Sequence, residues 1–219
     1  MCEEEQIKFN KEANDGISRK YDCLHNDIFN PIEQERLGRA LKTAIEAVKT
    51  NSSPAELTAL DYGSGSGNLT RHLIEAGINT VSADVSDGFL NLIERNFSHT
   101  GLSKTLKVNG KDLSGIEDGQ FDLVATYSVL HHVPDYLQIV KEMCRVLKPG
   151  GVLFIDHEVI ESYYQRPEEY IEFLKKARPI INIKRYLRLL FDVKGYKHIL
   201  LTFYSILLSL VVYLPNYEL

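Results

Sequence analysis

Residues 57–69 read Leu57-Thr-Ala-Leu-Asp-Tyr-Gly-Ser-Gly-Ser-Gly-Asn-Leu69, and this stretch decides the fold. An apolar segment ends in Asp61, and glycines then occupy every second position until a helical pattern begins. Because glycine has no Cβ, a ligand can approach the backbone of such a turn closely. The helix that follows offers unpaired amide groups and the positive end of its dipole. The stretch therefore predicts a nucleotide-type pocket at the carboxyl edge of a parallel sheet.

The remaining sequence is that of an ordinary globular α/β protein. It has 219 residues, of which 44% are hydrophobic and 25% charged, and a formal net charge of -5. This charge provides no overall basic field that would recruit nucleic acid. Cys2, Cys23 and Cys144 lack metal-ligand spacing, which favours reduced thiols in a cytosolic protein and no metal site. The acidic N-terminus has no apolar run behind it, so we expect no secretory signal and a cytoplasmic location.

Strands and helices alternate along the middle of the chain. Buried strands are predicted up to Asp61 and at 80–85, within 104–108, at 119–127 and at 151–156, with helical patterns between them. Ahead of the first strand, helical spacing places Leu37, Leu41, Ala44, Ile45 and Val48 on one face and predicts an amphipathic helix that packs on the sheet. For the helix after Pro134, apolar spacing predicts an inward face made by Leu137, Val140, Cys144 and Leu147. Five such β-α units in series predict a doubly wound, mostly parallel sheet with helices on both faces. We expect one domain, with an N-terminal helical cap at 1–52, a cofactor-binding core at 53–158 and a tail at 159–219.

Carboxylates follow three successive strands at their carboxyl ends. These are Asp61, Asp84 and Asp112. Asp84 lies about 20 residues after the glycine turn, the distance expected for a carboxylate that binds ribose hydroxyls. The glycines follow Gly-x-Gly-x-Gly rather than the dinucleotide pattern Gly-x-Gly-x-x-Gly, and Asn68 occupies the third glycine position of that pattern. An acidic residue before the turn is unfavourable for a pyrophosphate but suits the positive charges of S-adenosylmethionine.

The whole set of motifs resembles the class I S-adenosylmethionine-dependent methyltransferases. Residues 59–69 are similar to their first motif, 83–86 to their ribose-binding motif, and 111–113 to their adenine-binding segment. Residues 121–124, 129–133 and 147–151 resemble later motifs of the small-molecule branch, often labelled type 11. Each motif is weak alone, but all occur in order between residues 56 and 156. The resemblance implies a Rossmann-like methyltransferase fold with an atypical C-terminal part, because strands six and seven cannot be placed.

The resemblance also implies roles for individual residues around S-adenosyl-L-methionine. The predicted cofactor-binding residues are Asp61 as a counter-charge, Gly63, Ser64 and Gly65 at the methionine portion, Asp84 and Val85 at the ribose, Asp112 and Leu113 at the adenine, and Tyr127 and Ser128 near the sulfonium. Tyr21 is expected on an N-terminal lid. Structural roles remain alternatives: the glycines can form a simple turn, Asp84 can cap a helix, and Asp112 can be a solvated loop residue.

His131 and His132 are the candidate catalytic residues. They follow the fourth predicted strand at its carboxyl end, beside the expected position of the methyl group, where a histidine could accept a proton from the acceptor. The alternative is that the pair packs and forms hydrogen bonds at the start of the next helix.

The tail leaves more than one interpretation open. Residues 199–214 carry no charge, and basic residues gather upstream of them from Lys175 to Lys197. Such a pattern is typical of peripheral membrane contact, here through 175–214. A buried element on the sheet, or a lid over an apolar substrate, would give the same pattern.

The sequence therefore predicts methyl transfer from S-adenosylmethionine to a small-molecule or lipid-like acceptor. One alternative is a catalytically inactive scaffold that retains the same fold. The other is a nicotinamide-dependent oxidoreductase, which the glycine spacing and Asp61 disfavour. Nucleic acid is not an expected partner.

Overall fold

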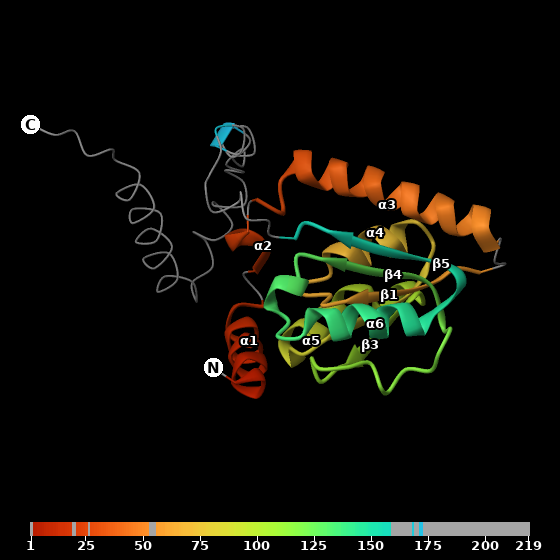
Figure 1. Cartoon of the computed structure of the whole chain (residues 1–219). Coiled ribbons are helices and arrows are strands. Elements are labelled where there is room, and N and C mark those ends of the chain that lie inside the picture. The colour runs from red at the N-terminus through yellow and green to blue at the C-terminus, as the bar shows by residue number, and fades with distance from the viewer. Residues whose placement is uncertain are drawn as a thin grey trace, which may run out of the picture. The chain divides into compact units, whose positions relative to one another are not determined.

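A computed structural model describes residues 2–18, 21–25, 27–52, 56–158, 168 and 171–172. Its centre is a five-stranded sheet formed by β1 (Thr58–Tyr62), β2 (Asn79–Asp84), β3 (Ser103–Lys107), β4 (Phe121–Tyr127) and β5 (Leu147–Asp156). The strand order is β3-β2-β1-β4-β5, and every neighbouring pair is parallel (Figure 1). This arrangement confirms the predicted α/β class and parallel sheet.

The sheet reverses its winding direction at β1. This strand pairs with β2 on one side and with β4 on the other, so the chain builds outward in both directions from the centre. Loops that leave β1 and β4 diverge at such a switch point and open a crevice at the carboxyl ends of the strands. The glycine turn after β1 therefore lies where the fold itself provides a ligand site.

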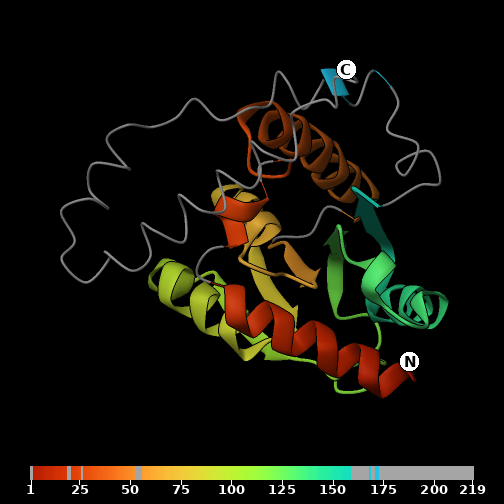
Figure 2. The same cartoon turned by 90° about the vertical axis from the view of Figure 1, so that its left-hand side faces the viewer.

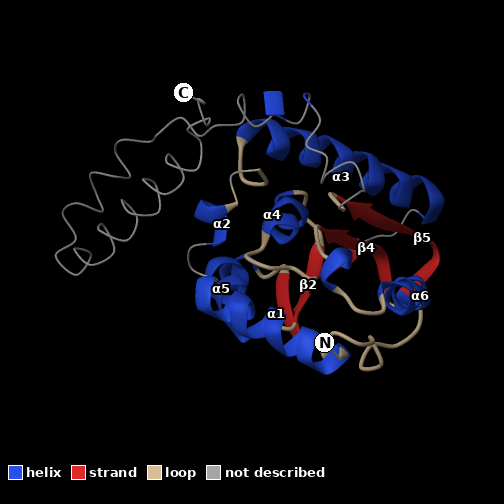
Figure 3. Ribbon diagram, turned by 60° about the vertical axis from the view of Figure 1, so that its left-hand side comes forward, coloured by secondary structure: helices blue, strands red, loops and turns tan. Residues whose placement is uncertain are grey.

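Helices cover both faces of the sheet. They are α1 (Glu3–Ile17), α2 (Tyr21–Leu24), α3 (Pro31–Ser52), α4 (Asn68–Glu75), α5 (Asp87–Phe97) and α6 (Tyr136–Val146), with short 3-10 turns η1 (Ser98–Thr100) and η2 (Leu130–His132). α3 and α4 pack on one face and α6 on the other, while α5 packs on β2 and β3 (Figure 3). The α3 stripe predicted from Leu37, Leu41 and Val48 is fully buried, as expected.

Two hydrophobic cores flank the sheet. One joins α3 and α4 to Ala59, Leu123 and Ala125, and the other joins α6 to Leu60 and Val124. All residues of β4 are buried, because alternate side chains enter opposite cores. The carboxyl end of β4 is thereby held rigidly between two packed layers.

The predicted inward face of α6 is partly wrong: Val140 and Leu147 pack against the core that contains Leu60 and Val124, but the other two residues do not. Leu137 is 59% exposed and Cys144 is exposed, whereas Ile139, Met143 and Val146 are buried. Two apolar stripes interleave in this segment, and spacing alone does not distinguish them. The Asp135 carboxylate accepts the Gln138 amide and caps the start of the helix.

Two further boundaries differ from the sequence predictions. β5 begins at Leu147 rather than Gly151, since the Lys-Pro-Gly-Gly segment is already part of the strand. α1 lies within the helical cap predicted at 1–52, but its bounds were not predicted, because its residues are mostly polar and form no apolar stripe. The C-terminal tail, including the possible membrane contact at 175–214 and any further strands, lies outside the described residues apart from isolated positions. No helix in the described part of the chain is long and apolar enough to span a membrane.

Candidate active site

A cavity of about 250 Å³ lies at the carboxyl ends of β1, β2 and β4. Residues from the loops after these strands and from α1 line it. Figure 2 shows α1 on the carboxyl side of the sheet. Its walls are made by Ile7, Phe9, Asn10, Ala13, Asn14, Tyr21, Tyr62, Gly63, Gly65, Asp84, Val85, Phe89, Val108, Gly110, Ser128, Val129, His132, Val133 and Pro134. The cavity therefore occupies the crevice that the strand order predicts.

The structure brings only part of the predicted site residues to this cavity. Those that line it are Gly63, Gly65, Asp84, Val85, Ser128 and His132, together with Tyr21. Those that do not line it are Asp61, Ser64, Asp112, Leu113, Tyr127 and His131. The Ser64 hydroxyl is buried and has no hydrogen-bond partner among the described residues. The other members of the second group contact other parts of the protein, as described below.

Gly63 and Gly65 both belong to the glycine turn, but the absence of a side chain has a different consequence at each position. Both have positive φ, +69° at Gly63 and +52° at Gly65. A Cβ on Gly63 would lie 2.5 Å from both methyl carbons of Val129, so this glycine allows the turn after β1 to pack against the loop after β4. A Cβ on Gly65 would meet nothing closer than 4.0 Å, so its backbone is open to the cavity. Gly65 is therefore the position where a ligand can approach.

Asp84 connects the glycine turn with the turn after β2. Its Oδ2 accepts the Gly65 amide at 2.9 Å, and its Oδ1 accepts the Ser86 amide at 2.8 Å. Burial raises the pKa of Asp84 in spite of these hydrogen bonds. The carboxylate is thus fixed at the cavity wall, where it can accept hydrogen bonds from a ligand's hydroxyl groups.

Asp61 lies behind the glycine turn rather than in the cavity wall. It is 1% exposed, and its Oδ2 accepts the Thr70 hydroxyl at 2.7 Å. Burial raises its pKa to about 7, although the Thr70 hydrogen bonds oppose this shift. The Asp61 carboxyl group therefore holds its proton to a higher pH than an exposed aspartate does.

Asp112 and Leu113 are engaged within the protein. The Asp112 carboxylate accepts the Ser114 amide and hydroxyl and the Asn109 side-chain amide. The Leu113 amide donates to Glu142 of α6 at 3.1 Å. All three hydrogen bonds to Asp112 end on its Oδ1. An adenine at this edge could therefore donate to Oδ2, whereas the Leu113 amide would first have to leave Glu142.

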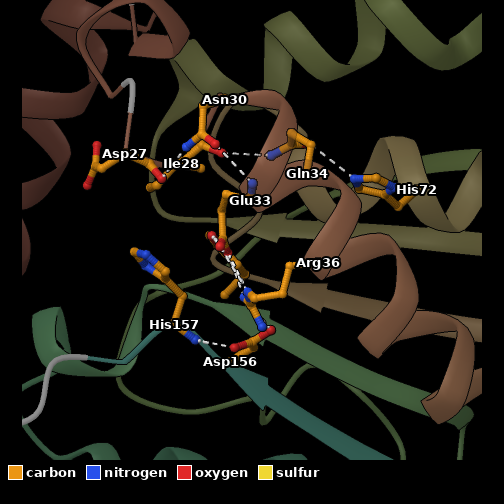
Figure 4. A network of polar contacts seen from close by, with 10 residues as sticks. Asp27, Ile28, Asn30, Glu33, Gln34, Arg36, His72, Asp156 and His157 are labelled. Atoms are coloured by element: carbon orange, nitrogen blue, oxygen red, sulfur yellow. Dashed lines mark hydrogen bonds and ion pairs between the residues drawn. The ribbon is translucent and has the colours of Figure 1, made fainter. Parts of the chain in front are cut away.

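Tyr127 faces α3 rather than the cavity. Its hydroxyl donates to Glu33 at 2.8 Å, and its ring stacks on His157 with 4.8 Å between the ring centroids. Arg36 also binds Glu33 and reaches Asp156 at 2.9 Å, so a polar network joins α3 to the ends of β4 and β5 (Figure 4). The next residue, Ser128, has a φ of +59° and lines the cavity.

Glu158 organises the two candidate histidines, and sequence reasoning missed it. Its carboxylate accepts the backbone amides of residues 129–131 and lies 2.8 Å from Nδ1 of His131. Burial alone would raise the pKa of Glu158, but the hydrogen bonds from His131 and the amides lower it to about 2. His132 lines the cavity, with its ring 4.1 Å from that of His131 between centroids. Burial, together with neighbouring His131, lowers the pKa of His132.

The N-terminal segment supplies a wall that the sequence indicated only through Tyr21. The Tyr21 ring packs edge-on against Phe89, with 5.2 Å between centroids. α1 adds Ile7, Asn10 and Asn14, which recur at helical spacing. This recurrence is the only sequence signal for that wall, and two of the three residues are polar, so it does not stand out as a core stripe. No group of metal-ligating side chains occurs among the residues that the structure describes.

Comparison with known proteins decides what kind of domain holds this site. A family model described as a methyltransferase domain matches residues 60–155. Those residues form a class I S-adenosylmethionine-dependent methyltransferase domain. The match confirms the resemblance drawn from the motifs and agrees with the parallel sheet.

Relatives of this methyltransferase domain include enzymes of quinone biosynthesis. The ubiquinone biosynthesis O-methyltransferase of Methylococcus capsulatus is 32% identical over 111 residues, which cover 50% of this chain and 47% of that protein. The demethylmenaquinone methyltransferase of Staphylococcus aureus is 34% identical over 139 residues, covering 63% and 55%. The chain thus spans about half the length of these curated relatives. The CurJ carbon methyltransferase structure shares the fold, with a TM-score of 0.54 and 17% identity over 64% of this chain and 40% of that one.

Proposed function

We propose that this protein transfers a methyl group from S-adenosylmethionine to a small or lipid-like acceptor related to quinone precursors. The observation that carries the proposal is the juxtaposition of Asp84 with the open backbone of Gly65 in one cavity. This pair fits an adenosyl cofactor, because Asp84 can accept from ribose hydroxyls while the Gly65 turn admits the methionine portion. The domain match supports the same cofactor.

The cofactor supplies an electrophilic methyl group on a sulfonium. The residues of this chain bind and orient the two reactants, and α1 forms one wall of the cavity. Asp61, behind the turn, lends negative charge near the cationic cofactor once it is ionised. Well-oriented reactants can account for about 7–11 kcal/mol of the barrier in such a reaction.

His132 is the better placed of the two candidate bases. It lines the cavity, and its lowered pKa keeps the imidazole neutral at pH 7, which is the form that accepts a proton from an acceptor hydroxyl. His131 does not line the cavity and contacts Glu158 instead, so we assign it to positioning the turn.

The acceptor class follows from the cavity wall and from the relatives. Ile7, Phe9, Val133 and Pro134 give the cavity an apolar side next to His132. Such a wall suits an aromatic or lipid-like molecule that carries one hydroxyl or an acidic carbon. The names of the curated relatives, which refer to ubiquinone and menaquinone pathways, favour that class.

The proposal is tested by binding and by transfer. Calorimetry with S-adenosylhomocysteine should give a saturable signal that Asp84→Ala weakens at least about tenfold, whereas Asp118→Asn, an exposed residue outside the cavity, should leave it unchanged. Incubation of the protein with methyl-labelled cofactor and a fractionated lipid extract should then yield a labelled product. Absence of binding contradicts the methyltransferase function, and binding without any labelled product favours the scaffold alternative.

A further inference from the structure

α1 spans three of the loops that surround the cavity. Its Glu4 pairs with Lys111 after β3 at 2.9 Å, and its Asn10 amide donates to the His132 carbonyl after β4 at 3.0 Å. Near its C-terminal end, Asp15 contacts the turn after β2. The helix therefore lies across the carboxyl edge as a cover (Figure 2).

The contact of Asp15 is the most specific of these. Its Oδ1 accepts the Ser86 hydroxyl and, at 2.9 Å, the Gly88 amide. A Cβ on Gly88 would lie 3.1 Å from the Asp15 carboxylate and 3.0 Å from the Ser18 hydroxyl, so the glycine permits this close approach. Lys11 strengthens the same junction through an ion pair with Asp87 at 3.0 Å.

Ser86 connects Asp15 to the ribose-side carboxylate. The Ser86 amide donates to Asp84, and the Ser86 hydroxyl contacts Asp15, so one residue contacts both the cavity wall and the cover. Asp84 in turn accepts the Gly65 amide. An unbroken series of hydrogen bonds thus runs from α1 through the turn after β2 to the glycine turn.

The closed cavity is small for an adenosyl cofactor. Its volume of about 250 Å³ lies below the range of about 300–1,000 Å³ that is typical of small-molecule sites. The small volume fits a cover that lies further from the sheet while a cofactor enters and returns through the contacts described above.

We propose that Asp15 is a positioning residue that couples docking of α1 to the ribose-binding turn, so that cofactor binding and closure of the cover occur together. This inference rests on the proposed function, since it assumes that Asp84 binds the ribose. Asp15 itself does not line the cavity and acts through Ser86. Loss of its carboxylate should weaken cofactor binding without touching the methyl-transfer geometry.

The test compares two acidic residues of the same helix. Asp15→Ala should raise the Kd of S-adenosylhomocysteine about tenfold, because a hydrogen-bonded charged group is lost. Glu12→Ala is the matched control, since Glu12 pairs only with exposed Lys8 at 3.9 Å. Asp15→Asn keeps an oxygen that accepts both hydrogen bonds and should restore most of the affinity. Gly88→Ala, which crowds the same junction from α5 while improving helix propensity, should act like Asp15→Ala.

Hydrogen exchange of the α1 amides distinguishes coupling between α1 docking and cofactor binding from a general loss of protein stability. In the wild type and in Glu12→Ala, S-adenosylhomocysteine should slow exchange in α1, and in Asp15→Ala this protection should be lost. Faster exchange of α1 in ligand-free Asp15→Ala than in ligand-free Glu12→Ala supports docking through Asp15. Wild-type affinity in Asp15→Ala, or ligand binding without any change in α1 exchange, would overturn the coupling. Absence of ligand binding by the wild type contradicts the proposed function itself.

Discussion

Asp61 and Asp84 are both buried carboxyls at the same sheet edge, but they meet different partners. Asp84 accepts two backbone amides and lines the cavity. Asp61 accepts the Thr70 side chain behind the turn, and its pKa rises to about 7. Two residues that look equivalent in the sequence therefore differ in their hydrogen-bond partners and in access to a ligand.

Asp61→Asn should make stability less dependent on pH. In the unfolded chain an aspartate has a pKa of about 3.9. Because burial raises the pKa of Asp61 to about 7, the folded state binds more protons between these values, and stability falls as pH rises through this window. The asparagine side chain of the variant cannot ionise. The free energy of unfolding of the variant minus that of the wild type should therefore be larger at pH 8 than at pH 5. Urea unfolding at both pH values measures this difference.

Exposed Asp22→Asn is the control for this measurement and should leave the pH dependence unchanged. Some dependence will remain in Asp61→Asn, because burial also raises the pKa of Asp84. Equal pH dependence in the wild type and in Asp61→Asn would contradict a raised pKa at Asp61.

The turn η2 depends on a carboxylate that follows β5. Glu158 accepts the amides of residues 129–131, which would otherwise lack partners at the start of this short turn. The same carboxylate binds His131. The position of the histidine pair therefore depends on two strands, β4 and β5, and not on the local sequence alone.

Glu158→Ala should destabilise the protein by about 1–3 kcal/mol, because the partly buried amides of Val129 and Leu130 lose a charged acceptor. Glu158→Gln retains an acceptor oxygen but loses the charge, and should fall between alanine and the wild type. Chemical denaturation at pH 7 measures these differences, with exposed Glu117→Ala as a control that should unfold like the wild type. If Glu158→Ala matches that control, the carboxylate does not support the turn.

The long helix α3 is joined to the sheet by polar contacts as well as by its apolar stripe. Glu33 of α3 accepts the Tyr127 hydroxyl of β4. Arg36 of α3 donates both to Glu33 and to Asp156 of β5 (Figure 4). Burial, together with Glu33, raises the pKa of Tyr127, so its hydroxyl stays protonated and donates to the carboxylate. This network lies on the opposite side of β4 from the cavity residue Val129 and its neighbours.

Tyr127→Phe should therefore lower the stability of the protein without changing its affinity for the cofactor. Loss of the hydroxyl removes a hydrogen bond to the buried Glu33 and should lower the free energy of unfolding by about 1–3 kcal/mol. Affinity for S-adenosylhomocysteine should stay at the wild-type value, because Tyr127 does not line the cavity. Tyr136→Phe, at a residue that is 51% exposed, is the control for stability. A marked loss of affinity for S-adenosylhomocysteine in Tyr127→Phe would show that Tyr127 contributes to cofactor binding.

Much of this fold was predictable because its signals are local. The glycine turn, the carboxylates after β1 and β2, and the alternation of strands with helices each occupy a short stretch of chain. The sheet and the α3 stripe followed from them. The inward face of α6 did not, because two apolar stripes overlap there and packing selected the one with Ile139, Met143 and Val146.

The sequence by itself determined the parallel sheet, the family of the central domain and the position of the ligand crevice. Each of these depends on glycine, aspartate and apolar residues at fixed spacing along one segment. Only the tertiary structure decided which candidates meet in the cavity. Tyr127 and Ser128 are neighbours in sequence, yet they face opposite sides, and Asp15 and Glu158 reach the site from distant segments. Such contacts depend on how whole elements pack, and no local pattern encodes that.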